Sequence, residues 1–323
     1  MNDNKGKAVK FLSKNRLFFI LLCVIIIMSA INPRFFTVSN FSNIFKQIAT
    51  NSVLAAGLCF VILTGGIDIS VGSVLAFIGA VSVTLVSGGM NIILVIFISL
   101  LLGAVIGFMN GALVAYFNLQ AMIVTLATSS IFRGLTYILT DGAPIPLKTS
   151  ITGGAIYKWI GSGNVVGALS FPLVIVILIY IIAFFILNRT AYGRHVYALG
   201  GNEEAAKMSG INTTCAKTMA YVVCGIMSAI AGILISARVS SAQPTAGQSY
   251  EMDAIAAVVI GGTSLRGGEG RVLYTVIGAI IIGMLNNFLN LMGVDSYYQI
   301  VVKGVVILIA VLSDAKTVKS STK

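Results

Sequence analysis

The sequence predicts an all-α polytopic membrane protein that forms one domain, residues 1–323, with about ten transmembrane helices. Two observations support this class: 57% of the residues are hydrophobic and only 10% are charged, and the mean hydropathy is +0.99. A soluble domain of this length could not bury so much apolar surface. Long apolar runs in a bilayer must be helical, because each segment has to satisfy its own backbone hydrogen bonds.

The expected spans follow from the apolar runs, since a bilayer crossing takes about 20 such residues. The longest external loops expected are residues 141–170 and 238–250. The eighth run is short and ends in glycine, so nine spans is the main alternative to ten. The spans are expected at residues 17–32, 47–64, 70–88, 91–117, 119–140, 171–188, 214–237, 251–263, 271–292 and 297–313.

The distribution of Lys and Arg predicts that both termini lie in the cytoplasm. With that orientation most of the 21 basic residues fall in cytoplasmic segments, as the positive-inside rule requires. The basic residues at 5–16 could also begin a secretory signal, but no convincing cleavage site follows the first apolar run. Because the basic residues are scattered over membrane-flanking loops, the net charge of +11 implies no nucleic-acid partner.

Asp68 lies in a polar interruption, residues 64–72, between the second and third apolar runs. A charge near the bilayer centre is costly, so this carboxylate is expected at the surface, in a pair or beside a wet cavity. Asp is a strong helix N-cap and a span begins directly after it, so we expect Asp68 or Ser70 to cap that helix. A role in a solute pathway is the alternative.

Glycine spacing and polar side chains within the spans give further expectations. Gly103, Gly107 and Gly111 form a GxxxGxxxG ridge, which predicts close packing against another helix. The internal similarity between residues 61–80 and 258–279 is weak. It fits either coincidence between apolar sequences or the glycine-interrupted repeats of some transporters.

Four polar residues are expected at membrane depth in addition to Asp68. Arg133 and Lys303 lie in the outer halves of their spans, where snorkelling to the interface or a structural pairing is favoured over solute contact. Asn286 and Asn290 share a helix face, and their amides suit hydrogen bonds between helices. They also suit a pathway for an uncharged polyhydroxylated solute, because Asp68 is nearly alone as a carboxylate within the spans.

The segment Tyr192–Ile211 is the one long polar stretch in the second half of the chain, and it is expected to face the cytoplasm. Asn202 can cap a helix, the two glutamates that follow suit its first turn, and Gly210 supplies a left-handed stop. We expect a two-turn helix supported by Glu203 and Lys207, four residues apart. A helix this short is marginal in water, so a membrane surface or a partner's groove must hold it.

The sequence lacks the residues on which common enzymes depend. His195 is the only histidine, the four cysteines show no CxxC spacing, and no GxxxxGK[ST] motif occurs. A Ser/His/Asp site or a multi-histidine metal site has little to build from, and P-loop binding of ATP is ruled out. We therefore expect no enzyme activity, metal or cofactor in this chain, and any ATP-driven work must come from a partner.

Five segments together form a specific pattern: ILTGGIDISVGSVLA (62–76), IFRGLTYILTDG (131–142), YALGGNEEAAKMSGI (197–211), residues 240–271 and LNNFLNLMGVDSYYQIVVKG (285–304). On these segments the chain resembles the membrane permeases of ribose-type ATP-binding-cassette importers over nearly its whole length. The match is weakest in residues 141–170 and at both termini.

This resemblance implies a ten-span permease in the cell membrane with the vitamin-B12-permease-like, type II importer fold. Two copies would form the pathway for a monosaccharide, with ribose favoured and another sugar, autoinducer-2 or a nucleoside as alternatives. A cytoplasmic ATPase, usually two nucleotide-binding domains fused in one chain, would bind ATP. An extracytoplasmic binding protein would deliver the sugar.

The resemblance also implies a coupling loop, residues 190–213, that inserts into a cleft of the ATPase. A secondary transporter is the alternative of a different class, although it should need more carboxylates within its spans. The coupling motif maps onto Gly200, Gly201, Asn202, Glu203, Ala205, Ala206, Ser209, Gly210 and Ile211, with Glu204 inside it; the candidate pathway or gating residues are Asp68, Ser70, Arg133, Asn286, Asn290 and Lys303.

Overall fold

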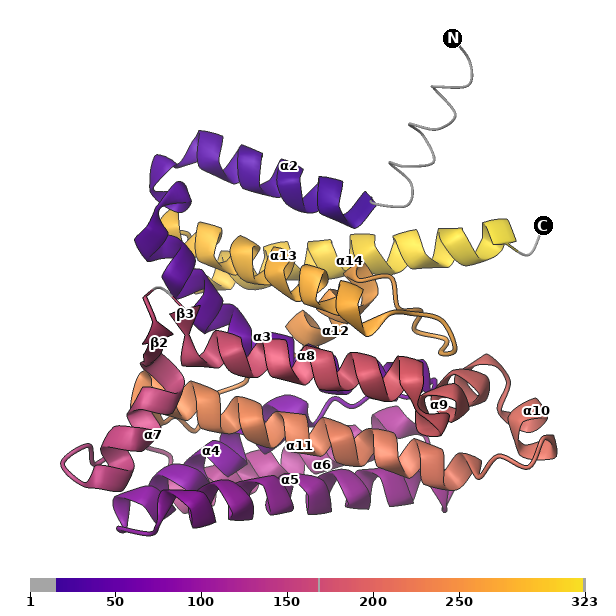
Figure 1. Cartoon of the computed structure of the whole chain (residues 1–323), viewed down its shortest axis with the longest axis horizontal. Coiled ribbons are helices and arrows are strands. Elements are labelled where there is room, and N and C mark those ends of the chain that lie inside the picture. The colour runs from indigo at the N-terminus through magenta and orange to yellow at the C-terminus, as the bar shows by residue number, and fades with distance from the viewer. Residues whose placement is uncertain (1–15, 168, 322–323) are drawn as a thin grey trace.

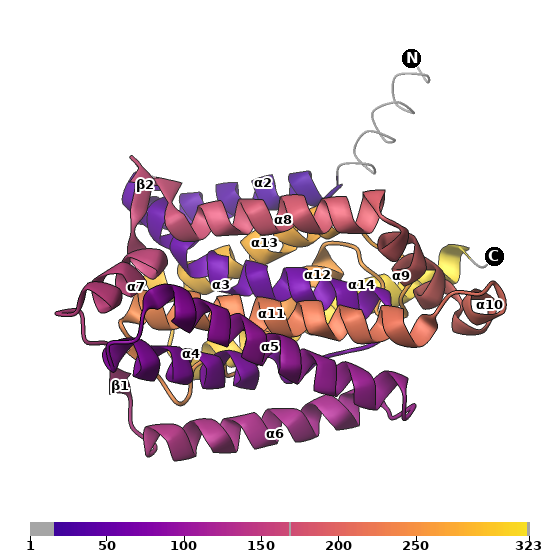
Figure 2. The ribbon, with the colours of Figure 1, turned by 60° about the horizontal axis from the view of Figure 1, so that its bottom comes forward.

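A computed structural model describes residues 16–167 and 169–321. Its helices run side by side in an elongated bundle with two distinct ends (Figures 1 and 2). Helices α9 and α10 and the C-terminal end of α14 lie at one end, which we call the α10 end. Helix α7 and strands β1, β2 and β3 lie at the other, which we call the strand end.

The ten apolar runs all coincide with helical segments. In chain order the elements are α2 (Arg16–Ile31), the 3-10 helix η1 (Pro33–Phe36), α3 (Val38–Leu63), α4 (Val71–Ser87), α5 (Ile92–Ala115), α6 (Ala121–Thr140), β1 (Ile145–Pro146), α7 (Thr152–Ser162), β2 (Asn164–Val166), β3 (Leu169–Ser170), α8 (Phe171–Arg189), α9 (Ala191–Gly201), α10 (Glu203–Met208), α11 (Thr213–Val239), β4 (Ser241–Ala242), α12 (Tyr250–Ile260), α13 (Val272–Leu291) and α14 (Ser296–Ser321).

Six of the helices in the described part of the chain are long and apolar enough to cross a membrane: α3, α5, α6, α8, α11 and α13. Shorter apolar helical segments occur at Leu17–Ile31, Val71–Ser87 and Ser296–Ile309, and α12 has 11 residues. The polytopic helical class is therefore confirmed. The count of ten spans and the type II arrangement stay predictions.

Burial and hydropathy run in opposite directions between α3 and α5, whereas α6, with a hydropathy of 1.4, is only 22% buried. The apolar window of α3 has a hydropathy of 1.5 and is 89% buried, whereas that of α5 has a hydropathy of 3.0 and is 28% buried. Lipid is as apolar as a protein core, so a helix that faces lipid must be hydrophobic on its outside as well. The centre of the bundle can therefore hold polar groups, provided that they find partners.

The glycine ridge of α5 packs directly against α11. A Cβ atom on Gly103 would collide with the carbonyl oxygen of Gly225, and one on Gly107 would collide with that of Tyr221. A Cβ atom on Gly111 would lie 2.8 Å from the Cα atom of Thr218. The predicted close packing is confirmed, and it fixes α11 along the middle of the bundle.

The long connections at the strand end are folded rather than open loops. Residues 141–170 contain β1, α7, β2 and β3, and β1 pairs antiparallel with β4 from the 238–250 connection, with Ile145 opposite Ala242. Tyr157 of α7 also shares a 2.7 Å hydrogen bond with Ser236 of α11. These contacts hold together two connections that are far apart in the sequence.

Candidate functional site

The polar segment at the α10 end contains two helices where the sequence indicated one. Asn202 caps α10 as predicted, since its Oδ1 accepts a hydrogen bond from the Ala205 amide at 2.9 Å, and Gly210 has the predicted left-handed backbone at φ +80°. The expected length is confirmed, because α10 spans 6 residues between its caps Asn202 and Ser209, which is nearly two turns. Helix α9 was not predicted, since its glycines disfavour a helix and burial of Val196 and Leu199 compensates.

The support for α10 differs from the expected pair between Glu203 and Lys207. The Nζ of Lys217, at the start of α11, instead lies 2.8 Å from both carboxylate oxygens of Glu203. The chain itself thus supplies one support for α10, and the expected contact with a membrane surface or a partner's groove stays a prediction. The sequence could not indicate this pair, because it joins residues that are separated by a turn between two helices.

The outer surface of α10 is open. Only Ala206 of this helix is buried, whereas Met208 has 89% of its surface exposed. The motif residues Gly201, Glu204, Ala205, Ser209 and Gly210 are exposed as well, and Ile211 is half-buried. The segment therefore projects from the bundle, as Figures 1 and 2 show, with most of its motif residues free to contact another molecule.

Glycine backbones from three segments meet behind α10. A Cβ atom on Gly200, at the end of α9, would collide with the carbonyl oxygen of Leu63 and the amide of Gly268. The Gly268 amide donates to the Leu63 carbonyl at 2.9 Å. A Cβ atom on Gly267 would lie 2.8 Å from the Gly65 amide. We call Gly65, Gly200, Gly267 and Gly268 the glycine junction; it joins the α3–α4 loop, the end of α9 and the α12–α13 loop.

The two weakly similar segments, residues 61–80 and 258–279, meet at the glycine junction. Residues 61–80 and 258–279 each end one helix, cross a glycine-rich loop and begin the next helix. The two loops touch at Gly65 and Gly267. Their similarity thus corresponds to two loops that lie side by side, next to the α9–α10 boundary.

Two tyrosines of α9 tie the same end together. The hydroxyl of Tyr192 donates to the Ala216 carbonyl at 3.3 Å, and that of Tyr197 donates to the Gly270 carbonyl at 3.0 Å. Burial raises the pKa of both phenols above the ordinary tyrosine value. They consequently remain neutral hydrogen-bond donors at physiological pH and keep α9 fastened to α11 and to the α12–α13 loop.

Asp68 and Ser70 belong to a buried polar cluster at the start of α4. The Oδ1 of Asp68 accepts from the Ser70 amide at 2.9 Å and from its hydroxyl at 2.6 Å. Asn110 of α5 donates to the Ser70 hydroxyl at 3.0 Å, and Thr128 of α6 donates to Asn110 at 2.7 Å. Asp68 thus holds the turn that leads into α4, but the expected cap is wrong: Ser70 occupies the N-cap position and makes no side-chain cap hydrogen bond, because its hydroxyl is directed to Asp68. A pathway role for either residue stays a prediction.

Arg133 of α6 is paired with backbone carbonyl groups. Its Nη1 donates to the carbonyl oxygens of Pro244 and Ala246 at 2.7 and 2.8 Å. The expected structural pairing is therefore present. Arg133 therefore joins α6 to residues 240–249, which we call the inner loop.

Lys303 lies in a second polar cluster, around Asp253. Its Nζ is 2.9 Å from the Oδ2 of Asp253, whose side chain is 2% exposed. Asn286 donates to the same oxygen at 3.1 Å, and Asn51 donates to it at 3.4 Å. The description of Asp68 as nearly alone is therefore wrong. Asp253 was overlooked although a carboxylate within an apolar run is itself a signal.

Asn286 and Asn290 point to different partners despite their common helix face. Asn290 is exposed, and its Oδ1 accepts from Gln299 at 2.9 Å, whereas Asn286 is directed to Asp253. Asn287 pairs reciprocally with Asn40 at 3.0 and 3.1 Å. The expected hydrogen bonds between helices are confirmed. Within residues 16–167 and 169–321, no group of three His, Cys, Asp or Glu side chains could hold a metal ion.

Comparison with known proteins identifies the family to which this arrangement belongs. The model of the family described as branched-chain amino acid transport system / permease component matches residues 40–311. The chain belongs to this permease family. The matched range includes α10, the glycine junction and both polar clusters.

Several transport permeases are similar to this permease over nearly its whole length. The ribose import permease protein RbsC of Haemophilus influenzae is 50% identical over 306 residues, which cover 94% of each chain. That of Escherichia coli K12 is 48% identical and covers 92% of each chain. That of Bacillus subtilis is 48% identical over 92% of this chain and 91% of its own. No solved structure matches.

These relatives confirm the resemblance to ribose-type permeases. The chain is thus the multi-pass membrane permease subunit of an ATP-binding-cassette importer, and its relatives are transport proteins rather than enzymes.

Proposed function

We propose that this permease imports ribose across the cell membrane, driven by a separate ATPase and supplied by an extracytoplasmic binding protein. The observation that carries the choice of sugar is the 48–50% identity to three ribose import permeases, against 36% to the D-allose transport system permease protein of Escherichia coli. The other monosaccharides, autoinducer-2 and nucleosides are the alternatives that a transport assay would distinguish.

The ATPase docks on the coupling loop, residues 190–213, in this proposal. The support is geometric: α10 projects from the bundle, its motif residues are exposed, and its position is fixed by the Asn202 cap and the Lys217–Glu203 ion pair. A helix presented in this way suits insertion into a groove. ATP binds to the partner ATPase, with two nucleotide-binding domains that close on each other.

The α10 end faces the cytoplasm, and with it both termini. Basic residues that are distant in the sequence gather there and at the end of α14, and the positive-inside rule assigns such an end to the cytoplasm. The basic residues at 5–14 and Lys323, which supported the same orientation, lie outside the described residues. Those at the α10 end and the end of α14 are Arg189, Arg194, Lys207, Lys217, Arg266, Arg271, Lys316 and Lys319.

Force from the ATPase passes through the glycine junction. Because Gly200 lies against Leu63 and Gly268 without intervening side chains, a displacement of α9 and α10 must move the α3–α4 and α12–α13 loops. The α3–α4 loop leads to Asp68 and Ser70, and the α12–α13 loop joins the helix that bears Asp253. Two permease copies then alternate between outward and inward access, which requires sugar or partners to bind the two states differently.

The test is reconstitution of the purified permease with its ATPase and binding protein in liposomes. We expect ATP hydrolysis to rise when ribose-loaded binding protein is added, and ribose to accumulate inside. Uptake of ribose without ATP would contradict the proposal and favour a secondary transporter. Stimulation by another sugar but not by ribose would retain the importer and replace its substrate.

A further inference from the structure

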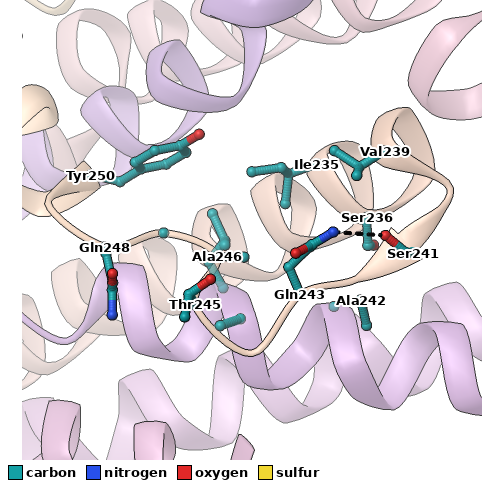
Figure 3. A pocket seen from close by; sticks show the side chains of 14 residues that line it. Ile235, Ser236, Val239, Ser241, Ala242, Gln243, Thr245, Ala246, Gln248 and Tyr250 are labelled. Atoms are coloured by element: carbon teal, nitrogen blue, oxygen red, sulfur yellow. Dashed lines mark hydrogen bonds between the residues drawn. The ribbon is translucent and has the colours of Figure 1, made fainter. Parts of the chain in front are cut away.

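A cavity of about 240 Å³ lies between the inner loop, α4 and α11. Figure 3 shows Gln243, Thr245 and Gln248 from the loop and Tyr250 from α12 around it, with Ile235 and Val239 of α11 on another side. We call this cavity the inner-loop pocket. It lies apart from the two polar clusters described above, and none of the candidate site residues lines it.

The inner loop reaches deep into the bundle. It leaves β4 at the strand end, yet a Cβ atom on Gly72 would collide with the carbonyl oxygen of Gly247. Gly72 lies in the first turn of α4, roughly 20 Å from Ser87 at the strand end of that helix, at about 1.5 Å per residue. Helix α12, with 11 residues, then completes the crossing to the α10 end.

Backbone without helical hydrogen bonds is tolerated at such a depth only where protein buries it or where it lines a water-filled cavity. The inner loop meets both conditions. The Arg133 guanidinium binds the carbonyl oxygens of Pro244 and Ala246, and the opposite side of the loop faces the pocket, where Thr245 and Gln248 are exposed. Arg133 therefore keeps the loop in place while leaving its side chains available.

The pocket lining has the chemistry of a site for a neutral sugar. Among the described residues, the lining contains no Asp, Glu, Lys, Arg or His side chain. It offers the amides of Gln243 and Gln248 and the hydroxyls of Ser241 and Thr245. Gln243 Nε2 donates to the Ser241 hydroxyl at 3.2 Å, and all four groups retain further donor or acceptor positions for sugar hydroxyls. The ring of Tyr250 provides an apolar face. Because ligand pockets for drug-sized molecules occupy about 300–1,000 Å³, this smaller cavity suits a monosaccharide.

We propose that the inner-loop pocket is a sugar subsite on the transport pathway, where Gln243, Thr245 and Gln248 bind the hydroxyls of a single monosaccharide. This inference rests on the proposed function, because it places the substrate of that same permease. The subsite binds an uncharged pentose or hexose and rejects ions and disaccharides. Arg133 is a positioning residue for it, acting through the loop carbonyls.

A labelling experiment tests access and occupancy in the reconstituted complex. Cys23 and Cys215 are exposed and are first replaced by serine, after which Thr245→Cys is introduced. We expect a small thiol reagent to label this cysteine, and D-ribose to slow the labelling at least about fivefold while maltose does not. Thr149→Cys, on the exposed 141–170 connection, serves as the matched control, and its labelling should be insensitive to both sugars.

Either of two results overturns the subsite: no labelling of Thr245→Cys in the absence of sugar, or labelling that ribose does not slow. The proposed function is judged separately by ribose uptake in the wild-type complex. A wild-type complex that takes up ribose but shows no protection retains the importer and removes the subsite. A wild-type complex that takes up no monosaccharide removes the function itself.

Sugar selectivity gives a second readout that a purely structural role would not change. Loss of one hydrogen bond to a hydroxyl should lower the preference for ribose over the matching deoxyribose about five- to tenfold in Gln243→Leu or Gln248→Leu. The binding protein is the same in every assay, so a change in this ratio belongs to the permease. In a variant that still assembles with the ATPase, an equal loss of both uptakes would contradict the assignment.

Discussion

The Nζ of Lys217 lies 2.8 Å from both carboxylate oxygens of Glu203, so the first residue of α10 is tied to the start of α11. Lys217 has 13% of its side chain exposed and Glu203 has 51%. The charge of Lys217 is thus turned inward to the pair rather than toward a docking partner. This makes Lys217 a suitable position for separating the support of α10 from the contacts that α10 makes.

Replacing Lys217 should uncouple transport while the permease stays folded. We expect Lys217→Met to lower ribose uptake per ATP hydrolysed several-fold, because α10 loses its anchor. The free energy of unfolding should change by less than about 1 kcal/mol, since partly exposed ion pairs contribute little. Uptake and ATPase assays on liposomes check this, with Lys148→Met at the strand end as the control. Undiminished uptake in Lys217→Met would show that the ion pair is dispensable.

Alanine substitution of two adjacent glycines, Gly200 and Gly201, should have opposite effects on coupling. Gly200→Ala should disrupt coupling, because its Cβ atom would collide with Leu63 and Gly268. Gly201→Ala should be tolerated within the fold, because its Cβ atom meets nothing within 4 Å. A bulky Gly201→Trp should instead block the ATPase directly.

Pull-down of the ATPase separates these effects. It should fail for Gly201→Trp and succeed for Gly200→Ala, whose defect appears only in sugar uptake. Normal uptake by Gly200→Ala would mean that the junction transmits nothing.

The packing of α5 on α11 predicts a stability difference between two helical glycines. Gly107→Ala should lower the free energy of unfolding by about 1–3 kcal/mol, because the added methyl group would collide with the Tyr221 carbonyl. Gly134→Ala in α6 meets nothing within 4 Å, so it should be neutral or stabilising by up to about 1 kcal/mol. Thermal unfolding of both variants in detergent checks this prediction, and equal losses would contradict it.

The buried pair of Asp253 and Lys303 predicts a non-additive double mutant. Asp253→Asn alone should cost about 3–5 kcal/mol, since it leaves the lysine charge without its partner in an apolar setting. Combining it with Lys303→Met should recover much of the loss. Unfolding measurements on the two single variants and the double variant form the test. Additive losses would show that the two residues act independently.

The polytopic helical class, the ten apolar helical segments and the local caps of α10 could be predicted from the sequence, whereas α7 and α9 were not predicted. Continuous apolar runs must become helices in a bilayer, and the Asn202 cap, the Gly210 stop and the GxxxG spacing on α5 act over a few residues each, so local patterns were sufficient. The same patterns, quoted as motifs, indicated the permease family, and the relatives confirmed it.

Which apolar faces are buried, and which polar residues contact one another, became visible only in the packed bundle. Hydropathy cannot separate a core-facing side from a lipid-facing side, since α5 is more hydrophobic than α3 yet far less buried. The pairs Lys217–Glu203 and Lys303–Asp253 and the glycine junction join separate segments of the chain. Such contacts depend on how the helices pack, and packing is a property of the whole bundle rather than of any local stretch of sequence.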